Sequence, residues 1–435
     1  MRMQNCAHKP NHRLPHIREI AFPQSAKAQR AFLKAGTASQ VQHAGLECKY
    51  EYPAREQEAK YARGKFFLWT HRVAFLKMSG VKFNPRKIYP LPSPDEISKY
   101  LLDSPAPLRG DWEFFASGRC ALNRVILEIK KRGFRGRMFL PRYFCPEAAR
   151  SISKNVKVEF FEDLPSEDSP RFETLNAAPG DAVMAVNFFG LRDMALWAEW
   201  KRLNPETILL ENASHTPFSY GAADADFAFG SLRKWLPLSD GGFVSAKNPA
   251  EIFRKPASSM PDFASDFLAA SLSRAQENVF SDDFAERLFY GAEAKISAIT
   301  NPARMSAYSM HMLARLDVTK MAEVRYCSVR AFSLKAALGG YFEELSFSGG
   351  RNPEKFSVYC PVLRFRAAHV RDAVYAELRK EGMFAPIYWG GFGANGSAAA
   401  RAESSKSMCI PPFFADSPQE AENFCEFIIS LCAGV

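Results

Sequence analysis

The sequence places one lysine, Lys234, directly after an apolar stretch that is typical of a β-strand. In the segment ADFAFGSLRKWLPLSDGG (residues 225–242), this lysine follows Ser231 by three positions and precedes a glycine pair. A lysine is costly to bury, so its place at the end of a buried strand indicates a chemical task, such as Schiff-base formation with a carbonyl compound. The alternative is a surface lysine whose aliphatic stem covers apolar neighbours, the common arrangement of a lone lysine.

A turn and a helix upstream of this lysine have the pattern of an anion-binding site. The segment SGRCALNRVILEIKKRG (residues 117–133) has apolar residues three and four positions apart, which predicts a helix. The helix begins at Gly118, Arg119 and Cys120. Backbone N–H groups at a helix N-terminus bind anions such as phosphate without any particular side chain, so an ordinary helix start and a phosphate site have the same sequence pattern here.

The elements that would position these residues alternate along the chain between residues 111 and 250. Nearly continuous apolar runs, such as DAVMAVNFFG and TILLEN, alternate with segments of helical spacing. This order predicts a three-layer α/β/α domain with a mostly parallel sheet. Because ligands bind beyond the carboxyl ends of such strands, we expect the site where the strands end, at residues 141–145, 187, 211–215 and 231–234.

The whole chain divides into four segments. We place the large α/β domain at residues 85–250 and a helical connection with a dimer region at residues 251–330. Residues 331–435 alternate strands with helices, which predicts a smaller C-terminal α+β domain. Residues 1–84 have no sustained hydrophobic period, and we expect them to form a basic, disordered N-terminal extension.

The positive charge of the chain is concentrated in that extension. Residues 1–90 hold 17 lysines and arginines against 5 acids, whereas the formal net charge of the whole chain is +10. The remainder is therefore almost neutral, and we do not expect nucleic acid as a partner of the folded part. For the extension itself, a nucleic-acid arm, a transit peptide, an unfolded tail and a start codon placed too far upstream of Met78 all stay open.

The spacing of the cysteines and the hydropathy of the chain limit the cellular compartments and partners that we expect. The nine cysteines are odd in number and contain no C-x-x-C pair, which argues against a disulfide framework and a structural zinc site. No apolar run approaches the roughly 20 residues that a membrane span needs. We therefore expect a cytoplasmic protein with no metal site and no membrane partner.

Four segments together resemble the DegT/StrS-like sugar aminotransferases, a family of fold type I pyridoxal-phosphate enzymes. SGRCAL is similar to the family's phosphate turn, LPRYFCPEAARSI to a strand-to-helix segment, LLENASH to its iEDaAH/Q motif and GSLRKWLPLSDGG to its S-x-x-K...GG motif. They occur in the family's order, which is more specific than any one of them. The resemblance covers about residues 85–435 at low identity and is strongest at 111–245.

The resemblance implies that the fold binds pyridoxal 5'-phosphate. Lys234 would form the Schiff base with this cofactor and shuttle the proton during transfer. The residues Gly118, Arg119, Cys120 and Ser231 would hold its phosphate.

Other residues would surround the cofactor ring. The resemblance places His215 near the ring or its phenolic oxygen, and Asn187 at the same strand-end edge. The family has an aromatic residue where this chain has Cys145, so Tyr143, Phe144 or the thiol itself would contact the ring.

Two positions depart from the family's pattern. Asn212 stands where the family has an aspartate, whose charge keeps the pyridine nitrogen protonated, so we expect a neutral ring and a weaker electron sink. Tyr388 in PIYW stands where the family has a histidine.

The segment NPARMS resembles a family segment that reaches the cofactor phosphate of the neighbouring subunit. It contributes Asn301 and Arg304, with one extra residue between them, and a helix-capping loop is an equal alternative. The resemblance thus implies a homodimer.

The activity implied by the resemblance is transfer of an amino group from an amino acid donor to a keto-sugar nucleotide or a related precursor. A place in polysaccharide biosynthesis goes with this substrate class. Two alternatives stay open: a pyridoxal-phosphate dehydratase or lyase on the same scaffold, and a weakened or non-catalytic relative, because of Asn212.

Overall fold

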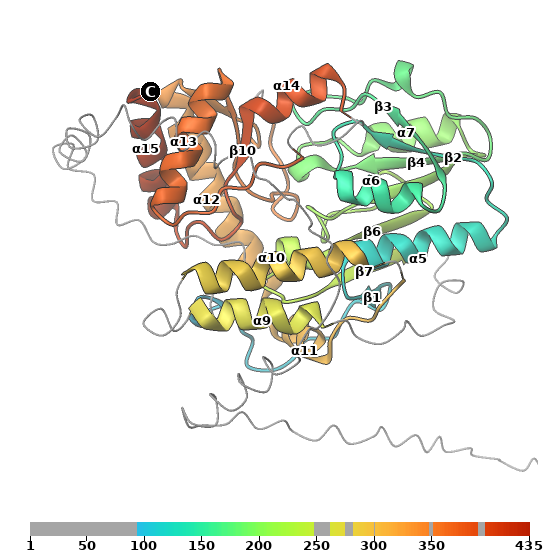
Figure 1. Cartoon of the computed structure of the whole chain (residues 1–435), viewed down its shortest axis with the longest axis horizontal. Helices are drawn as coiled ribbons and strands as arrows, with labels where there is room; N and C mark the ends of the chain where they lie inside the picture. Colours follow the sequence, from blue (N-terminus) through green and yellow to red (C-terminus); the bar gives the residue numbers. More distant parts are fainter. Residues whose placement is uncertain (1–93, 248–261, 275–281, 300, 348–350, 390–395) are drawn as a thin grey trace, which may run out of the picture. The chain divides into compact units, whose positions relative to one another are not determined.

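The computed structural model of this protein describes residues 94–247, 262–274, 282–299, 301–347, 351–389 and 396–435 (Figure 1). The expected N-terminal extension, residues 1–84, lies outside the described residues.

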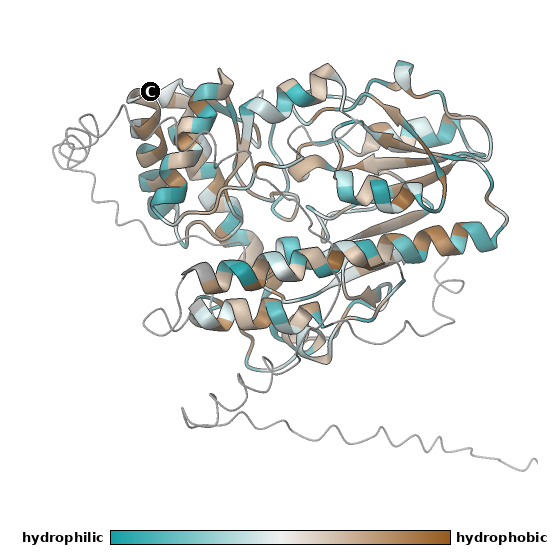
Figure 2. Cartoon of the chain, in the orientation of Figure 1, coloured by the Kyte–Doolittle hydropathy of each residue, from teal (hydrophilic) through white to brown (hydrophobic). Residues whose placement is uncertain are grey.

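A seven-stranded sheet forms the centre of the larger part. Its strands occur in the order β1-β7-β6-β5-β4-β2-β3, and the five from β6 to β3 are mutually parallel, while β7 and β1 are antiparallel additions. Figure 2 shows these strands largely in the hydrophobic colour, as expected for strands covered on both faces. The strands are β1 (Glu113–Phe115), β2 (Arg137–Pro141), β3 (Lys157–Phe161), β4 (Ala182–Val186), β5 (Ile208–Asn212), β6 (Phe227–Ser231) and β7 (Gly242–Ala246).

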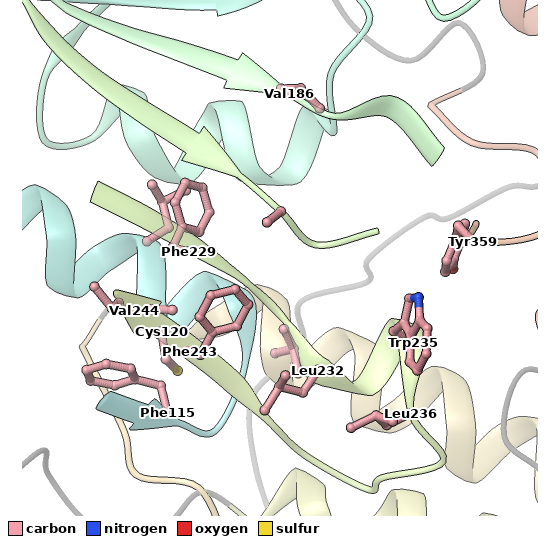
Figure 3. Close-up of a cluster of buried hydrophobic side chains, with 14 of the residues drawn as sticks. Phe115, Cys120, Val186, Phe229, Leu232, Trp235, Leu236, Phe243, Val244 and Tyr359 are labelled. Carbon is pink, nitrogen blue, oxygen red and sulfur yellow. The ribbon is translucent and has the colours of Figure 1, made fainter. Parts of the chain in front are cut away.

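Helices and apolar clusters cover both faces of the sheet. On one face, α5 (Gly118–Lys131) packs on β6 and β7, and Figure 3 shows Phe115, Cys120, Phe229 and Phe243 of this cluster close together. On the other face, a separate cluster is centred on the fully buried Trp197. The remaining elements here are α4 (Pro94–Ser98), α6 (Pro146–Ser153), η1 (Phe172–Thr174), η2 (Phe188–Gly190), α7 (Ala195–Leu203) and α8 (Leu232–Trp235).

The second half of the chain is mainly helical and carries a small sheet. The helices α9 and α10 pack side by side, and the long α12 packs along α15 over an antiparallel sheet of order β10-β9-β8. This part has its own apolar cluster, which includes Phe332, Phe365 and Phe424. The elements are α9 (Phe263–Arg274), α10 (Asp282–Ala298), α11 (Ala307–Arg315), α12 (Val318–Gly339), β8 (Phe342–Glu344), β9 (Val362–Phe365), α13 (Ala368–Lys380), α14 (Ala398–Lys406), β10 (Ser407–Cys409) and α15 (Pro418–Ala433).

The predicted fold class is confirmed: the chain has a mostly parallel sheet between helical layers and a smaller second sheet. The domain boundaries given above stay a prediction. Among the described helices, none combines the length and the apolar character needed to cross a membrane.

The parallel strands bring the predicted site residues to one edge of the sheet. Because β2, β4, β5 and β6 run in the same direction, the chain leaves all four at the same side. The residues at or just after these strand ends therefore gather there, although they are spread over almost 100 positions of the sequence.

Candidate active site

Lys234 lies in the short helix α8, which begins immediately after β6. Its Nζ atom is 3.3 Å from Nε2 of His215 and lies over the rings of Tyr388 and Trp389, at 5.3 and 5.8 Å from their centroids. Burial lowers the pKa of the Lys234 amine below its ordinary value. A larger fraction of this amine is therefore uncharged near neutral pH than for a surface lysine.

The neighbours of Lys234 in α8 fix its position. The indole of Trp235 is fully buried, and the backbone carbonyl oxygen of Trp235 accepts a hydrogen bond of 2.7 Å from Nη2 of Arg325. The guanidinium of Arg325 also lies 3.9 Å from the centre of the Trp235 ring. On the other side, Arg233 forms an ion pair of 2.6 Å with Glu293 of α10. The backbone that carries Lys234 is thus anchored from two helices.

His215 presents a defined face to the lysine. Its Nδ1 atom accepts a hydrogen bond of 3.1 Å from the backbone N–H of Phe189. Burial, and then the charge of Lys234, lower the pKa of His215 well below its ordinary value, so the ring is neutral. A neutral imidazole that accepts at Nδ1 carries its hydrogen at Nε2. The Nε2–H group therefore points to Lys234 as a donor, and an uncharged amine is the partner that can accept from it.

Aromatic rings lie close to His215. Its ring is nearly parallel to those of Phe189, at 4.7 Å and 10°, and Tyr359, at 4.6 Å and 17°. The hydroxyl groups of Tyr359 and Tyr388 are 2.8 Å apart. We call Phe189, Tyr359, Tyr388 and Trp389 the aromatic wall of the site.

Two residues of the aromatic wall have an unusual backbone. Phe189 and Trp389 have φ angles of 55° and 54°, in the left-handed region that costs a side-chain-bearing residue roughly 1–2 kcal/mol. Gly190 follows with φ of 83°, and a Cβ atom there would lie 1.8 Å from the carbonyl oxygen of Ser357. Close packing between the turn after β4 and the segment before Tyr359 therefore holds the strained turn in place.

The N-terminus of α5 meets the end of β6. A Cβ atom on Gly118 would lie 3.0 Å from the backbone nitrogen of Ser231, a tight contact that the glycine avoids. The side chain of Ser117 caps the helix by accepting from the N–H of Cys120, at 3.1 Å. The first N–H groups of a helix have no intrahelical acceptor, which leaves those of Gly118 and Arg119 suited to an anion.

Arg119 adds an unsatisfied donor to this place. Its Nη1 atom donates to the carbonyl oxygen of Ile296, at 3.2 Å, while its Nε atom is buried without a partner among the described residues. A buried guanidinium N–H without an acceptor is costly. An anion at the start of α5 would provide one.

The two asparagines at strand ends are engaged in turns. Asn212 is the last residue of β5, and its Oδ1 accepts from the N–H of Ser214 at 3.1 Å, which leaves its amide N–H groups as donors. Asn187 follows β4, and its Oδ1 accepts from the N–H of Arg192 at 3.3 Å. Asn187 thus shapes its own turn, and its backbone N–H also bonds to the carbonyl of Asn212.

The segment after β2 contributes three more of the predicted residues. Tyr143 donates its hydroxyl hydrogen to the carbonyl oxygen of Tyr388, at 3.2 Å, and its ring meets Trp389 edge to face at 5.2 Å. Phe144 lies 6.2 Å from Trp389. Burial is the main cause that raises the pKa of the Cys145 thiol, against smaller opposing effects of Lys234 and Arg119. These three residues therefore border the same site.

The structure does not bring Asn301 and Arg304 to this site within one chain. Both residues are exposed, and neither makes a hydrogen bond or ion pair with any site residue named above among the described residues. The backbone of Arg304 instead forms an antiparallel β-bridge with Phe115 of β1, and the carbonyl of Ala303 accepts from the N–H of Ala116 at 2.8 Å.

Sequence reasoning missed most of the aromatic wall. Phe189 carried a usable signal, because it follows β4 within two residues of Asn187. Tyr359 and Trp389 come from the second half of the chain, where no strand-end argument applies, and only the Tyr388 position was singled out by resemblance.

Comparisons with known proteins give a match at the level of structure. No protein-family model matches the sequence, and no curated protein is significantly similar to it. Spr1654 from Streptococcus pneumoniae, in its PLP form and classed as a candidate sugar aminotransferase, is 12% identical, with 80% of this chain and 99% of that chain covered and a TM-score of 0.54.

Two further solved structures match over similar lengths. Helicobacter pylori PseC, an aminotransferase involved in the biosynthesis of pseudoaminic acid, is 10% identical, with coverage of 80% and 100% and a TM-score of 0.53. The 3-amino-5-hydroxybenzoic acid synthase is 16% identical, with coverage of 74% and 86% and a TM-score of 0.53. Two of these three structures are aminotransferases by name, and this chain has the fold that the three share.

Proposed function

We propose that this protein is a pyridoxal-phosphate-dependent aminotransferase that transfers an amino group from an amino acid to a keto-sugar nucleotide or a related precursor. One observation carries the proposal: Lys234 is a lysine of lowered pKa that follows β6 and faces the Nε2 atom of His215. Two structural neighbours, a candidate sugar aminotransferase in its PLP form and an aminotransferase of pseudoaminic acid biosynthesis, support the substrate class.

The residues of this chain fit the cofactor. The helix start at Gly118, the unpartnered Nε of Arg119 and the nearby Ser231 suit its phosphate. Lys234 would hold the cofactor covalently, as the lysine in this class of site does. Bound there, pyridoxal phosphate supplies an electron sink for negative charge that develops on a substrate carbon.

Lys234 does the proton chemistry in this proposal. As an uncharged amine it can act as a nucleophile, and once free it can take a proton from the substrate α-carbon and return it elsewhere. The Nε2–H group of His215 holds Nζ in one orientation, and the aromatic wall limits the access of water to it.

Asn212 bears on the rate of this chemistry. With Oδ1 bonded to Ser214, its amide offers an N–H donor, which suits an unprotonated pyridine nitrogen. An uncharged ring withdraws electrons more weakly than a protonated one. We therefore infer a slow enzyme, and this residue is also the observation that keeps a weakened relative as the second candidate.

The exposed Asn301 and Arg304 support a homodimer in which they reach the partner's cofactor phosphate. Each site would then need both chains. The described cysteines are all free thiols, which supports a reducing compartment such as the cytoplasm.

A two-step assay tests the proposed function. Purified protein is mixed with glutamate or another amino donor, and its absorption is followed as the cofactor changes form; a panel of keto-sugar nucleotides is then tested for reversal. We expect a donor-dependent change that one acceptor class reverses, and no change in Lys234→Ala. Lys247→Ala is the matched control, because Lys247 makes a surface ion pair with Asp224. A protein that carries the cofactor but responds to no amino donor would contradict aminotransfer.

A further inference from the structure

A cavity of about 640 Å³ lies on the part of the chain that carries the small sheet, away from Lys234. It is lined by α12, the edge strand β8, β9 and the end of α14. We call it the cationic groove, because five of its lining residues are basic: Arg330, Arg351, Arg364, Arg366 and Lys406. Its size is that of sites for small molecules of nucleotide size.

Three of these five cations have no acidic partner in the part of the chain that the structure describes. Within the described residues, Arg330, Arg366 and Lys406 form no ion pair. Arg351 pairs with Asp168 at 3.0 Å, but the Asp168 side chain is 98% exposed, and such pairs contribute little. Arg364 is the better compensated one, since its Nε lies 3.3 Å from Oε2 of the buried Glu403.

The acids that line the groove do not neutralise it. Glu344 is buried, and its carboxylate accepts from the backbone N–H groups of Ser346 and Val362, at 3.0 and 3.1 Å. Burial raises the pKa of Glu344, against the opposing effect of these hydrogen bonds. Glu343 is exposed and is the other acid of the lining. The groove therefore keeps an excess of positive charge.

Apolar residues lie beside the cations. Leu334 is 66% exposed on α12 and presents an apolar side chain at the groove, whereas Phe342 and Phe365 are buried in the strands beneath it. A simple inorganic anion would use the charges but not this apolar side. Cations from separate elements suit several phosphate oxygens at once, since arginine binds phosphate through paired N–H groups.

We propose that the cationic groove binds a nucleoside di- or triphosphate, with its phosphates at Arg330, Arg366 and Lys406 and its base against the apolar side. None of the groove residues belongs to the site around Lys234. The two places are linked by α14: Lys406 lines the groove, and the Oγ atom of Ser404 donates to the carbonyl of Tyr388, at 3.2 Å.

Titration calorimetry on the intact protein tests this proposal with UDP, ADP, uridine and inorganic pyrophosphate as probes. We expect both nucleotides to bind. Pyrophosphate should bind about tenfold more weakly because it lacks the base that contacts the apolar side, and uridine about a hundredfold more weakly because it lacks the phosphates that form the charge-assisted bonds. The double variant Arg330→Gln/Arg366→Gln should lose at least about a hundredfold in nucleotide affinity. Arg202→Gln, an exposed arginine on α7, should bind as the native protein does.

The proposed activity is monitored separately in the same samples. If the nucleotide also binds at the site around Lys234, the double variant should keep that one binding event. The number of nucleotide sites per chain should then fall by one relative to native protein. The cofactor absorption should stay the same. Unchanged binding in the double variant, or pyrophosphate binding as tightly as UDP, would overturn the nucleotide site. Loss of the cofactor absorption in native protein would instead count against the proposed function.

Discussion

The site at Lys234 and the cationic groove use positive charge in opposite ways. The amine of Lys234 lies between His215 and the rings of Tyr388 and Trp389, and burial lowers its pKa. Arg330 and Arg366 lie exposed at the groove, and the planar guanidinium group of arginine is suited to binding phosphate. The buried lysine amine can thus lose its proton and act as a reagent, whereas the arginines of the groove would hold an anion.

Of all the replacements, that of Lys234 should distinguish the two uses of positive charge most strongly. We expect Lys234→Ala to lower the transamination rate by at least about a thousandfold, because it removes both the covalent attachment and the proton carrier. Nucleotide binding at the groove should not change. The measurement is steady-state turnover with calorimetry on the same variant, and a residual rate within tenfold of native would break the distinction.

Restoring a carboxylate beside the cofactor ring should have the next largest effect. Asn212→Asp is nearly isosteric and should stabilise a protonated ring, which favours α-proton removal by about ten- to a hundredfold. Stopped-flow absorption with an amino donor measures that step. If native protein already reacts rapidly and Asn212→Asp slows it, another group manages the ring nitrogen.

Replacing His215 tests how the surroundings of Lys234 control its amine. His215→Phe keeps an aromatic ring beside Phe189 and Tyr359 but leaves the N–H of Phe189 without its acceptor and Nζ of Lys234 without a donor. We expect about a tenfold lower rate. We also expect a shift of the part of the pH–rate profile in which the rate rises with pH, since that part follows loss of the proton from the Lys234 amine. His215→Gln, which can accept and donate, should restore part of both. A lower rate without that shift would mean that His215 is purely structural.

A smaller effect separates buried from exposed acids. Glu211 precedes Asn212 on β5, is fully buried, and accepts from the N–H of Gly221 at 3.0 Å; burial raises its pKa to about 7. The folded protein therefore holds a proton that the unfolded chain releases between about pH 4.5 and 7, so this group costs stability as pH rises through that range. Above pH 7 the cost levels off at about 3 kcal/mol.

Glu211→Gln should remove that cost. We expect the variant to be more stable than native protein at pH 8, with the difference shrinking toward zero near pH 4.5, as measured by urea unfolding across pH. Glu343→Gln is the exposed counterpart at the groove and should change stability by less than about 0.5 kcal/mol at either pH. Equal effects of the two variants would contradict the role of burial.

Features of this protein that depend on short segments could be predicted from the sequence, and features that depend on contacts between distant segments could not. Apolar runs and helical spacing are local, so the parallel strands, α5 and the place of Lys234 could be predicted from short segments. Tyr359 and Trp389 could not, because their positions beside His215 depend on how the two halves of the chain pack. Phe189 follows β4 closely, so the strand-end argument could have included it.

The groove and the dimer residues illustrate the same limit. The cations of the groove are spread from Arg330 to Lys406 and share no period, so only the packing of α12 and α14 around the small sheet brings them together. Among the described residues of one chain, Asn301 and Arg304 form no hydrogen bond or ion pair with the site around Lys234, and the short segment that contains them does not indicate which surface they would meet.

The most direct test of the central claim is chemical trapping at Lys234. Native protein is treated with borohydride, digested and mapped by mass spectrometry, with Lys234→Ala and Lys247→Ala treated in parallel. The account predicts a pyridoxyl group on Lys234 alone, together with loss of the visible absorption band, in native protein and Lys247→Ala. A pyridoxyl group on a different lysine, or a band that persists in Lys234→Ala, would contradict it.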